Sequence, residues 1–369
     1  MPIEITSAIC HGKDEALVLE RCQLDPPGPG EVLVRVVACG ICHTDIAVIT
    51  QDIPLPFPRV LGHEGSGIVE ACGAGVEDLS VGDHVLMSFG SCGDCDHCNS
   101  EEPAYCTTFR EINFAGERAG GPAIHQDGAP IGSNFFHQSS FATLALAQRR
   151  NVVKIDKDLP LDVLAPLGCG IQTGVGAVLN AIRPQAGDSF VVFGAGSVGL
   201  SSVMGAAIAG CSNICAVDLA ENRLALAREL GATHAFRGDD PDLVAKLREA
   251  SGGGYHCGLD TTGIPAVVDT ASQALRKRGM LALVAAPAPG TRYSVEARYM
   301  VGAGLSWRGV IEGDSNPPDF IPELIEYYRK GRLPVEKIIA HYPFEQINEA
   351  IHAMEDGSVV KPVLRMMQD

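Results

Sequence analysis

The stretch that decides the fold reads Phe-Val-Val-Phe-Gly-Ala-Gly-Ser-Val-Gly over residues 190–199. Its apolar start predicts a strand, and the glycines predict a tight turn into a helix. The next apolar run ends at Asp218, about 20 residues after the glycines. A pyrophosphate approaches a helix N-terminus closely at this glycine spacing, and the acidic residue accepts hydrogen bonds from a ribose hydroxyl. We therefore predict a dinucleotide site that uses Gly194, Gly196, Gly199 and Asp218.

Strand and helix patterns alternate after this motif. We predict strands over residues 234–236, 258–261 and 280–285, and helices over residues 221–230, 242–250 and 266–276. Such alternation indicates an α/β fold with a doubly wound parallel sheet.

Upstream, residues 40–45 read Gly-Ile-Cys-His-Thr-Asp and residues 62–67 read Gly-His-Glu-Gly-Ser-Gly. A thiol, an imidazole and carboxylates beside glycines are what an open zinc site needs. Cys42 and His63 are candidate ligands, and Cys169 in Pro-Leu-Gly-Cys-Gly is the best candidate for a third. Three protein ligands leave one position for water or substrate, which is the catalytic pattern. Taken alone, each Cys is more often a buried apolar residue.

A second cluster has the spacing of a closed metal site. Its members, at intervals of two, two and seven residues, are Cys92, Cys95, Cys98 and Cys106. Four thiolates can surround one tetrahedral zinc ion, which would then be structural. Disulfides and an iron–sulfur cluster are the alternatives, but the last interval does not match the bacterial ferredoxin run. His97 could replace one cysteine, although the complete set favours a surface position for it.

Short β-branched runs surround both cysteine motifs. We predict strands over residues 31–38, 67–71, 84–89, 141–147 and 152–155, without helices between the first three. This pattern indicates a compact β-barrel-like lobe. Residues 107–139 read as a long irregular loop whose phenylalanines either line an apolar pocket or hold the loop in place. After it, Asp162 is expected to cap a helix that runs through Cys169 to Ile182 and is interrupted by glycines.

Composition narrows the function classes. At 369 residues, the chain exceeds what one core usually holds, so two domains are expected. The 28 Lys and Arg against 45 Asp and Glu give a net charge of −17, which repels phosphate backbones and anionic membrane surfaces. We therefore expect neither nucleic acid nor membrane as a partner.

The first 20 residues show no secretory signal, and the 13 cysteines then favour a reducing compartment, so we expect a cytoplasmic protein. Residues 163–182 and 189–217 are uncharged and long enough to span a bilayer. Both are rich in glycine and polar residues, so we do not predict membrane spans.

In their order along the chain, Gly-Ile-Cys-His-Thr-Asp, Gly-His-Glu-Gly-Ser-Gly and Gly-Cys-Gly resemble the zinc-dependent medium-chain alcohol dehydrogenases, nearly end to end. The resemblance implies a GroES-like β-barrel catalytic domain over residues 1–170, with a structural zinc lobe at about 90–107. It implies an NAD-binding Rossmann domain over residues 171–311 and a return to the catalytic domain over residues 312–369. The returning tail reads as helix, helix and strand over residues 318–330, 344–355 and 359–365.

The same resemblance implies oxidation of an alcohol by hydride transfer to NAD, with one catalytic and one structural zinc ion per chain. Thr44 matches the hydroxyl that contacts the alcohol oxygen, and Asp45 matches the acid that orients His63. Glu64 matches a carboxylate behind the metal that transiently binds it. Ala47 stands where many members continue the proton relay with a histidine, so the outer half of the relay differs here.

The cofactor set implied by the resemblance extends beyond the glycines. His43 and Lys361 match basic positions that face the pyrophosphate, although a solvated tail residue is the alternative for Lys361. Asp218 favours NAD over NADP, and Arg223 offsets part of that preference. The remaining members of the predicted set are Thr173 and Val198.

Residues 166–174 and 311–314 look most like the branch that oxidises benzylic and allylic primary alcohols, with Phe89 and the loop phenylalanines as a candidate aromatic slot. Two alternatives stay open: a thiol-dependent formaldehyde dehydrogenase, and a nicotinamide-binding structural or regulatory protein. The resemblance also implies a small-molecule alcohol or aldehyde substrate and a homo-oligomer, dimer or tetramer, with Trp307 near the subunit interface.

Overall fold

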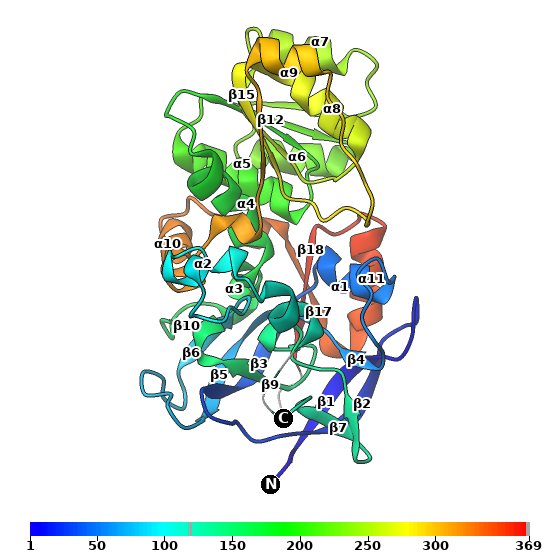
Figure 1. The fold of residues 1–369 in the computed structure, drawn as a ribbon, viewed down its shortest axis with the longest axis vertical. Helices are drawn as coiled ribbons and strands as arrows, with labels where there is room; N and C mark the ends of the chain where they lie inside the picture. Colours follow the sequence, from blue (N-terminus) through cyan, green and yellow to red (C-terminus); the bar gives the residue numbers. More distant parts are fainter. Residues whose placement is uncertain (117, 119, 367–369) are drawn as a thin grey trace. The chain divides into compact units, whose positions relative to one another are not determined.

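The computed structural model describes residues 1–116, 118 and 120–366 (Figure 1). These residues form two compact units. Unit 1 comprises Met1–Cys169, Asn316–Ile325 and Ile339–Asp369, and unit 2 comprises Gly170–Ser315 and Glu326–Ile338. The second part of unit 2 falls within the tail that we expected to return wholly to the catalytic domain.

Unit 2 is built on a fully parallel sheet with the strand order β13-β12-β11-β14-β15-β16. Its strands are β11 (Ser189–Phe193), β12 (Asn213–Asp218), β13 (His234–Arg237), β14 (Tyr255–Asp260), β15 (Leu275–Leu283) and β16 (Ser306–Gly309). The chain order reverses between β11 and β14, and nucleotides bind beyond the carboxyl ends of strands at such a switch point. The predicted doubly wound sheet is confirmed.

Helices cover this sheet. They are α5 (Ser197–Ala209), α6 (Glu221–Glu229), α7 (Leu243–Ala250), α8 (Pro265–Ala274) and α9 (Ala297–Ala303), while α4 (Gly170–Gly176) packs on α5. Helix α5 contacts β11 and β12, and α8 contacts β14 and β15 (Figure 1). The predicted helix over 266–276 ends two residues early, because buried Leu275 leaves the helix and pairs with Tyr255 of β14.

Unit 1 contains two further sheets. One has the order β4-β1-β2-β7-β8 and the other β10-β6-β5-β3-β18-β17, with β9 also paired to β3. Their strands are β1 (Ile3–Cys10), β2 (Val18–Leu24), β3 (Glu31–Gly40), β4 (Arg59–Val60), β5 (Glu64–Cys72), β6 (His84–Met87), β7 (Ile124–Gln126), β8 (Ala129–Ile131), β9 (Leu144–Gln148), β10 (Val152–Ile155), β17 (Ile339–Pro343) and β18 (Lys361–Arg365). The last strand, β18, pairs antiparallel with β3, so that Val363 lies opposite Gly40.

Short helices connect these strands or cover them. They are α1 (His43–Ile49), α2 (Asp96–Asn99), α3 (Leu161–Leu164) and α11 (Ile347–Glu355). The 13-residue helix α10 (Pro317–Arg329) begins in unit 1 and ends in unit 2. The expected irregular loop over 107–139 contains a π-helical turn, Glu111–Ala115, and the β7–β8 hairpin.

The helix that we predicted from Asp162 to Ile182 is interrupted at Cys169, whose φ of −146° and ψ of −80° are not helical. Just before the break, a Cβ on Gly168 would lie 2.2 Å from the Met87 carbonyl oxygen, so the backbone packs closely against β6 there. Among the described residues no single helix is long and apolar enough to cross a membrane, and only the bent pair Leu161–Gly168 with Gly170–Ile182 passes on length and composition.

Candidate metal and cofactor sites

Cys42, His63, Glu64 and Cys169 meet within unit 1, with their ligand atoms all within 4.8 Å of one another. Cys42 immediately precedes α1, His63 immediately precedes β5, and Glu64 begins that strand. Gly40 makes this convergence sterically feasible, because a Cβ there would lie 2.0 Å from Glu64 Oε2. Ligands bonded to zinc at about 2.0 to 2.3 Å lie roughly 3 to 4 Å apart, so the set fits that ion with small adjustment.

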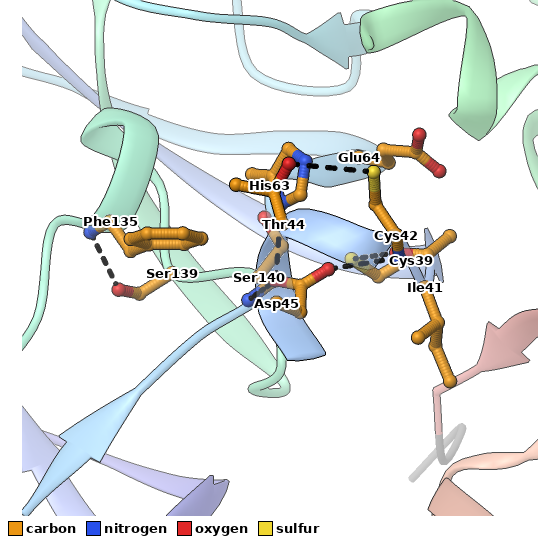
Figure 2. A network of polar contacts seen from close by, with 12 residues as sticks. Cys39, Ile41, Cys42, Thr44, Asp45, His63, Glu64, Phe135, Ser139 and Ser140 are labelled. Atoms are coloured by element: carbon orange, nitrogen blue, oxygen red, sulfur yellow. Dashed lines mark hydrogen bonds and ion pairs between the residues drawn. The ribbon is translucent and has the colours of Figure 1, made fainter. Parts of the chain in front are cut away.

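Asp45 makes the contact with His63 that its predicted orienting role requires (Figure 2). Its Oδ1 lies 3.0 Å from His63 Nδ1 and accepts a hydrogen bond from Gly62 N, while its Oδ2 accepts one from Cys42 N at 3.0 Å. Both side chains are fully buried. With Nδ1 held by the carboxylate, His63 Nε2 is buried and has no hydrogen-bond partner in the described structure. A buried imidazole nitrogen in this state is what a metal ligand presents before the ion is added.

Electrostatics favour the metal-binding form of the thiol. The hydrogen bond with Cys169 and the charge of Lys361 lower the pKa of Cys42 well below its usual value, against the effect of burial. Burial lowers the pKa of His63. Asp45 and Cys42 together raise this pKa by more than burial lowers it, so the net shift is well upward. A cation near Nε2 is therefore stabilised by the surrounding acidic groups.

Thr44 and His43 lie in the first turn of α1. Thr44 Oγ1 is 3.8 Å from Cys42 Sγ, so its hydroxyl belongs to the immediate surroundings of the ligand set (Figure 2). His43 is exposed, which leaves it accessible to a ligand.

Lys361 is buried, so the alternative interpretation of it as a solvated tail residue is wrong. It is 2% exposed, and its Nζ donates to Ile41 O at 2.9 Å and to both Glu64 oxygens at 3.0 and 2.9 Å. Burial raises the pKa of Glu64 to about 7, although Lys361 opposes the shift. Because all three ammonium protons have protein acceptors, a pyrophosphate contact would compete with this pair. That contact stays a prediction.

The second cysteine cluster forms in the loop that contains α2. The sulfurs of Cys92, Cys95, Cys98 and Cys106 all lie within 4.8 Å of one another. Hydrogen bonds from backbone N–H groups, first that of Thr107, lower the pKa of Cys95 to about 5. His97 points away from this set, since its exposed ring pairs with Glu102 at 3.2 Å. The donor set is thus four sulfurs, which fits a structural zinc ion.

The glycines of the predicted dinucleotide motif have the geometry that it requires. Gly194 has a φ of +90°, and a Cβ on Gly199 would lie 1.8 Å from Gly194 O. A Cβ on Gly196, at the N-terminus of α5, would meet no protein atom within 4 Å, so this side of the turn is open for a ligand. Asp218, at the end of β12, accepts hydrogen bonds from Ala195 N at 2.6 Å and Ala220 N at 2.9 Å, which fixes its carboxylate beside that turn.

The other predicted cofactor residues of unit 2 lie in three different helices. Val198 lies in the first turn of α5 and is half-buried. Arg223, in α6, has a buried Nε with no hydrogen-bond partner among the described residues. Thr173, in α4, donates its hydroxyl to Glu312 at 3.3 Å. Their contacts with a cofactor stay predictions.

Aromatic rings gather against His63. Phe136 stacks on the imidazole at 4.5 Å, and Phe135 meets it edge-on at 5.5 Å. Phe109 and Phe114 continue the cluster, and Phe89 joins it through Phe109. The loop phenylalanines therefore form one cluster that includes the ring of a predicted ligand. Beyond them, sequence reasoning missed Gln138, whose amide contacts the backbone of the same histidine.

Comparison with known proteins agrees with this geometry. Residues 28–157 match the family described as "Alcohol dehydrogenase GroES-like domain", and residues 197–328 match "Zinc-binding dehydrogenase". A geraniol dehydrogenase from Castellaniella defragrans is 42% identical over 98% of both chains. The chain belongs to the zinc-binding alcohol dehydrogenase family.

Solved structures of the family superpose closely on this chain. A benzyl alcohol dehydrogenase from Acinetobacter calcoaceticus is 43% identical with a TM-score of 0.96, over 99% of this chain and 100% of that one. An alcohol dehydrogenase zinc-binding domain protein from Burkholderia ambifaria is 45% identical with a TM-score of 0.98, over 100% of both. The GroES-like domain and the resemblance to zinc-dependent medium-chain alcohol dehydrogenases are confirmed.

Proposed function

We propose that this alcohol dehydrogenase oxidises primary benzylic or allylic alcohols to aldehydes, reversibly, with NAD as the hydride acceptor. The observation that carries the proposal is the aromatic cluster on His63, in a chain whose relatives include enzymes named for geraniol and benzyl alcohol. Phe135 and Phe136 are buried against His63, whereas Phe109 and Phe114 are half-buried and offer apolar ring surface to a conjugated substrate.

In this proposal Cys42, His63 and Cys169 hold the catalytic zinc ion, which when bound acts as a Lewis acid that makes an alcohol more acidic. Asp45 keeps the His63 proton on Nδ1, so that Nε2 stays available. Thr44 accepts a hydrogen bond from the alcohol hydroxyl and passes its proton outward. The next helical turn carries Ala47, so the proton leaves through water or a cofactor hydroxyl.

Asp218 and the Gly194–Gly199 turn bind NAD in unit 2, and the cluster of four cysteines holds a structural zinc ion in unit 1. We also propose a cytoplasmic homo-oligomer. The edge strand β16 and the exposed side chain of Val301 leave unit 2 with an unpaired, partly apolar margin in the described structure.

Side-by-side kinetics of benzyl alcohol, geraniol, cyclohexylmethanol and ethanol with NAD and NADP test the substrate class. Benzyl alcohol or geraniol should exceed ethanol in kcat/KM by at least about tenfold, which needs only ~1.4 kcal/mol of extra transition-state binding. Cyclohexylmethanol is about as large as benzyl alcohol but lacks its conjugated ring, so it distinguishes an effect of substrate size from one of conjugation. An advantage for ethanol would reject the substrate class, and formaldehyde oxidation that requires an added thiol would favour the alternative enzyme.

A further inference from the structure

Gln138 lies between the chain segments that carry the predicted catalytic zinc ligands. Its side chain is 2% exposed, and its Nε2 donates to His63 O at 2.9 Å and to Ser88 O at 3.2 Å. Its Oε1 accepts from Gly65 N at 3.0 Å and from Ser140 Oγ at 2.8 Å. An amide has two donor hydrogens and two acceptor lone pairs, so this side chain uses its full capacity.

The partners of Gln138 lead to two separate ligands. His63 and Gly65 enclose Glu64 at the start of β5, so two of the four bonds hold the strand end that carries the imidazole. Ser88 connects Gln138 to the segment that carries Cys169. Its Oγ donates to Gly168 O at 2.6 Å, and Gly168 precedes Cys169. Hydrogen bonds of Gln138 and Ser88 thus connect the backbone carbonyl of His63 to that of Gly168, the residue before Cys169.

The segment that carries Gln138 adopts an unfavourable backbone to reach this position. Asn134, Phe136, His137 and Ser139 have φ values between 50° and 62°, in a region that residues with a Cβ rarely occupy. Such conformations persist where the surroundings determine them, and they concentrate at functional sites. Here the hydrogen bonds from Phe135 N to Ser139 Oγ and from Ser139 Oγ to Val60 O hold the turn, both at 2.9 Å.

We propose that Gln138 is a positioning residue that fixes the separation of His63 and Cys169 and thereby retains the catalytic zinc ion. The inference rests on the proposed function, in which those two residues are ligands. A zinc site tolerates ligand displacements of only about 0.2 Å. Partners that orient metal ligands typically contribute 10- to 100-fold in metal affinity.

The test measures zinc release into a chromogenic chelator from the full-length holoenzyme. Gln138→Met keeps the length of the side chain and removes its hydrogen bonds. It should release the catalytic ion at least about tenfold faster than wild type, with the structural ion released at the wild-type rate. Cobalt substituted at the catalytic site should show a shifted visible spectrum in this variant.

Asn113→Leu is the matched control. Asn113 is also a buried amide of unit 1, and it joins Gly90 to Phe109 without contacting a predicted catalytic ligand. Its loss should lower thermal stability but leave release of the catalytic ion unchanged. Equal release rates for Gln138→Met and wild type, or equal acceleration in both variants, would overturn the proposal.

Ser88→Ala provides a second approach should Gln138→Met not fold. It breaks the link to Gly168, and faster release of the catalytic ion is expected. Zinc release from Ser88→Ala at the wild-type rate would also reject the proposed positioning role of these hydrogen bonds.

Cys42→Ser identifies the catalytic ion. If wild type and Cys42→Ser hold the same number of zinc ions, the proposed function itself fails and this inference fails with it. If they differ but Gln138→Met releases zinc normally, the inference alone fails.

Discussion

The thiol of Cys169 should be required for turnover but not for folding. Its thiol belongs to the catalytic ligand set and to none of the four-cysteine cluster. Cys169→Ser should therefore lower kcat/KM for benzyl alcohol at least about 100-fold, because loss of a direct ligand exceeds the 10- to 100-fold effect of outer partners. Metal analysis should find one zinc ion per chain.

Cys211→Ser is the control for this substitution, since Cys211 is a half-buried thiol outside both clusters. It should keep two zinc ions and normal turnover. Near wild-type kinetics with two ions in Cys169→Ser would show that the third ligand is elsewhere.

Asp218 should decide the choice between NAD and NADP. A 2′-phosphate about 4 Å from its carboxylate would meet roughly 4 kcal/mol of repulsion at an effective dielectric near 20. Arg223 offsets part of this, so we expect NAD to be preferred by at least about 100-fold in kcat/KM. Asp218→Ala should reduce the preference at least about tenfold. Asp240→Ala, which removes an acid paired with Lys246, should not change it. A wild-type preference for NADP would contradict the assignment.

The residues that lie in recognisable motifs were predictable from the sequence, and the residues outside any motif that pack around them were not. The family resemblance implied that Asp45 orients His63, and the two side chains lie 3.0 Å apart. Gln138 lies 75 positions from His63, and Lys361 lies 297 positions from Glu64. Neither spacing carries a pattern. The pairing of β18 with β3 brings Lys361 to the site, and the turn over residues 134–139, with its positive φ values, brings Gln138 there.

At the scale of elements, the loop around α2 should depend on its metal. This helix has only four residues, Asp96–Asn99, too few to be stable alone. A structural zinc ion can supply ~10 to 16 kcal/mol, comparable with the ~5 to 15 kcal/mol stability of a whole domain. Cys95→Ala should yield aggregated or protease-sensitive protein, assayed by limited proteolysis and thermal melting.

Cys211→Ala should remain folded and keep both ions, because that thiol is outside the cluster. Recovery of soluble, fully active Cys95→Ala with one zinc ion fewer would refute a structural role.

Elements with regular periodicity were predicted well, and the exact break in the helix at Cys169 was not. The strands before and after the Gly194 turn appear as the sequence indicated, because β-branched runs and glycines determine them locally. The helix predicted from Asp162 to Ile182, with interruptions at glycines, breaks at Cys169, where Gly168 packs on the Met87 carbonyl, 81 positions away in the sequence. Tertiary packing there overrides a helical pattern.

For the whole molecule, zinc ligands and the dinucleotide turn belong to different units, each with its own core. A substitution that abolishes function at one of these sites should therefore leave ligand binding at the other intact. Cys169→Ser should lose turnover but retain stabilisation by NAD. A ligand that binds only the folded state contributes about 2.7 kcal/mol at a hundred times its Kd.

Gly196→Val should give the opposite result. A Cβ at Gly196 meets no protein atom within 4 Å, so the larger side chain should leave unit 2 folded and fill the space open to the pyrophosphate. Both zinc ions should remain, while NAD no longer raises the Tm and activity at fixed NAD falls. Gly302→Val is the matched control, since Gly302 in α9 has the same open surroundings and lies outside the dinucleotide motif. Because the control adds the same methyl groups to the same unit, a normal Tm increase with NAD in Gly196→Val would mean that the pyrophosphate binds elsewhere than at the start of α5.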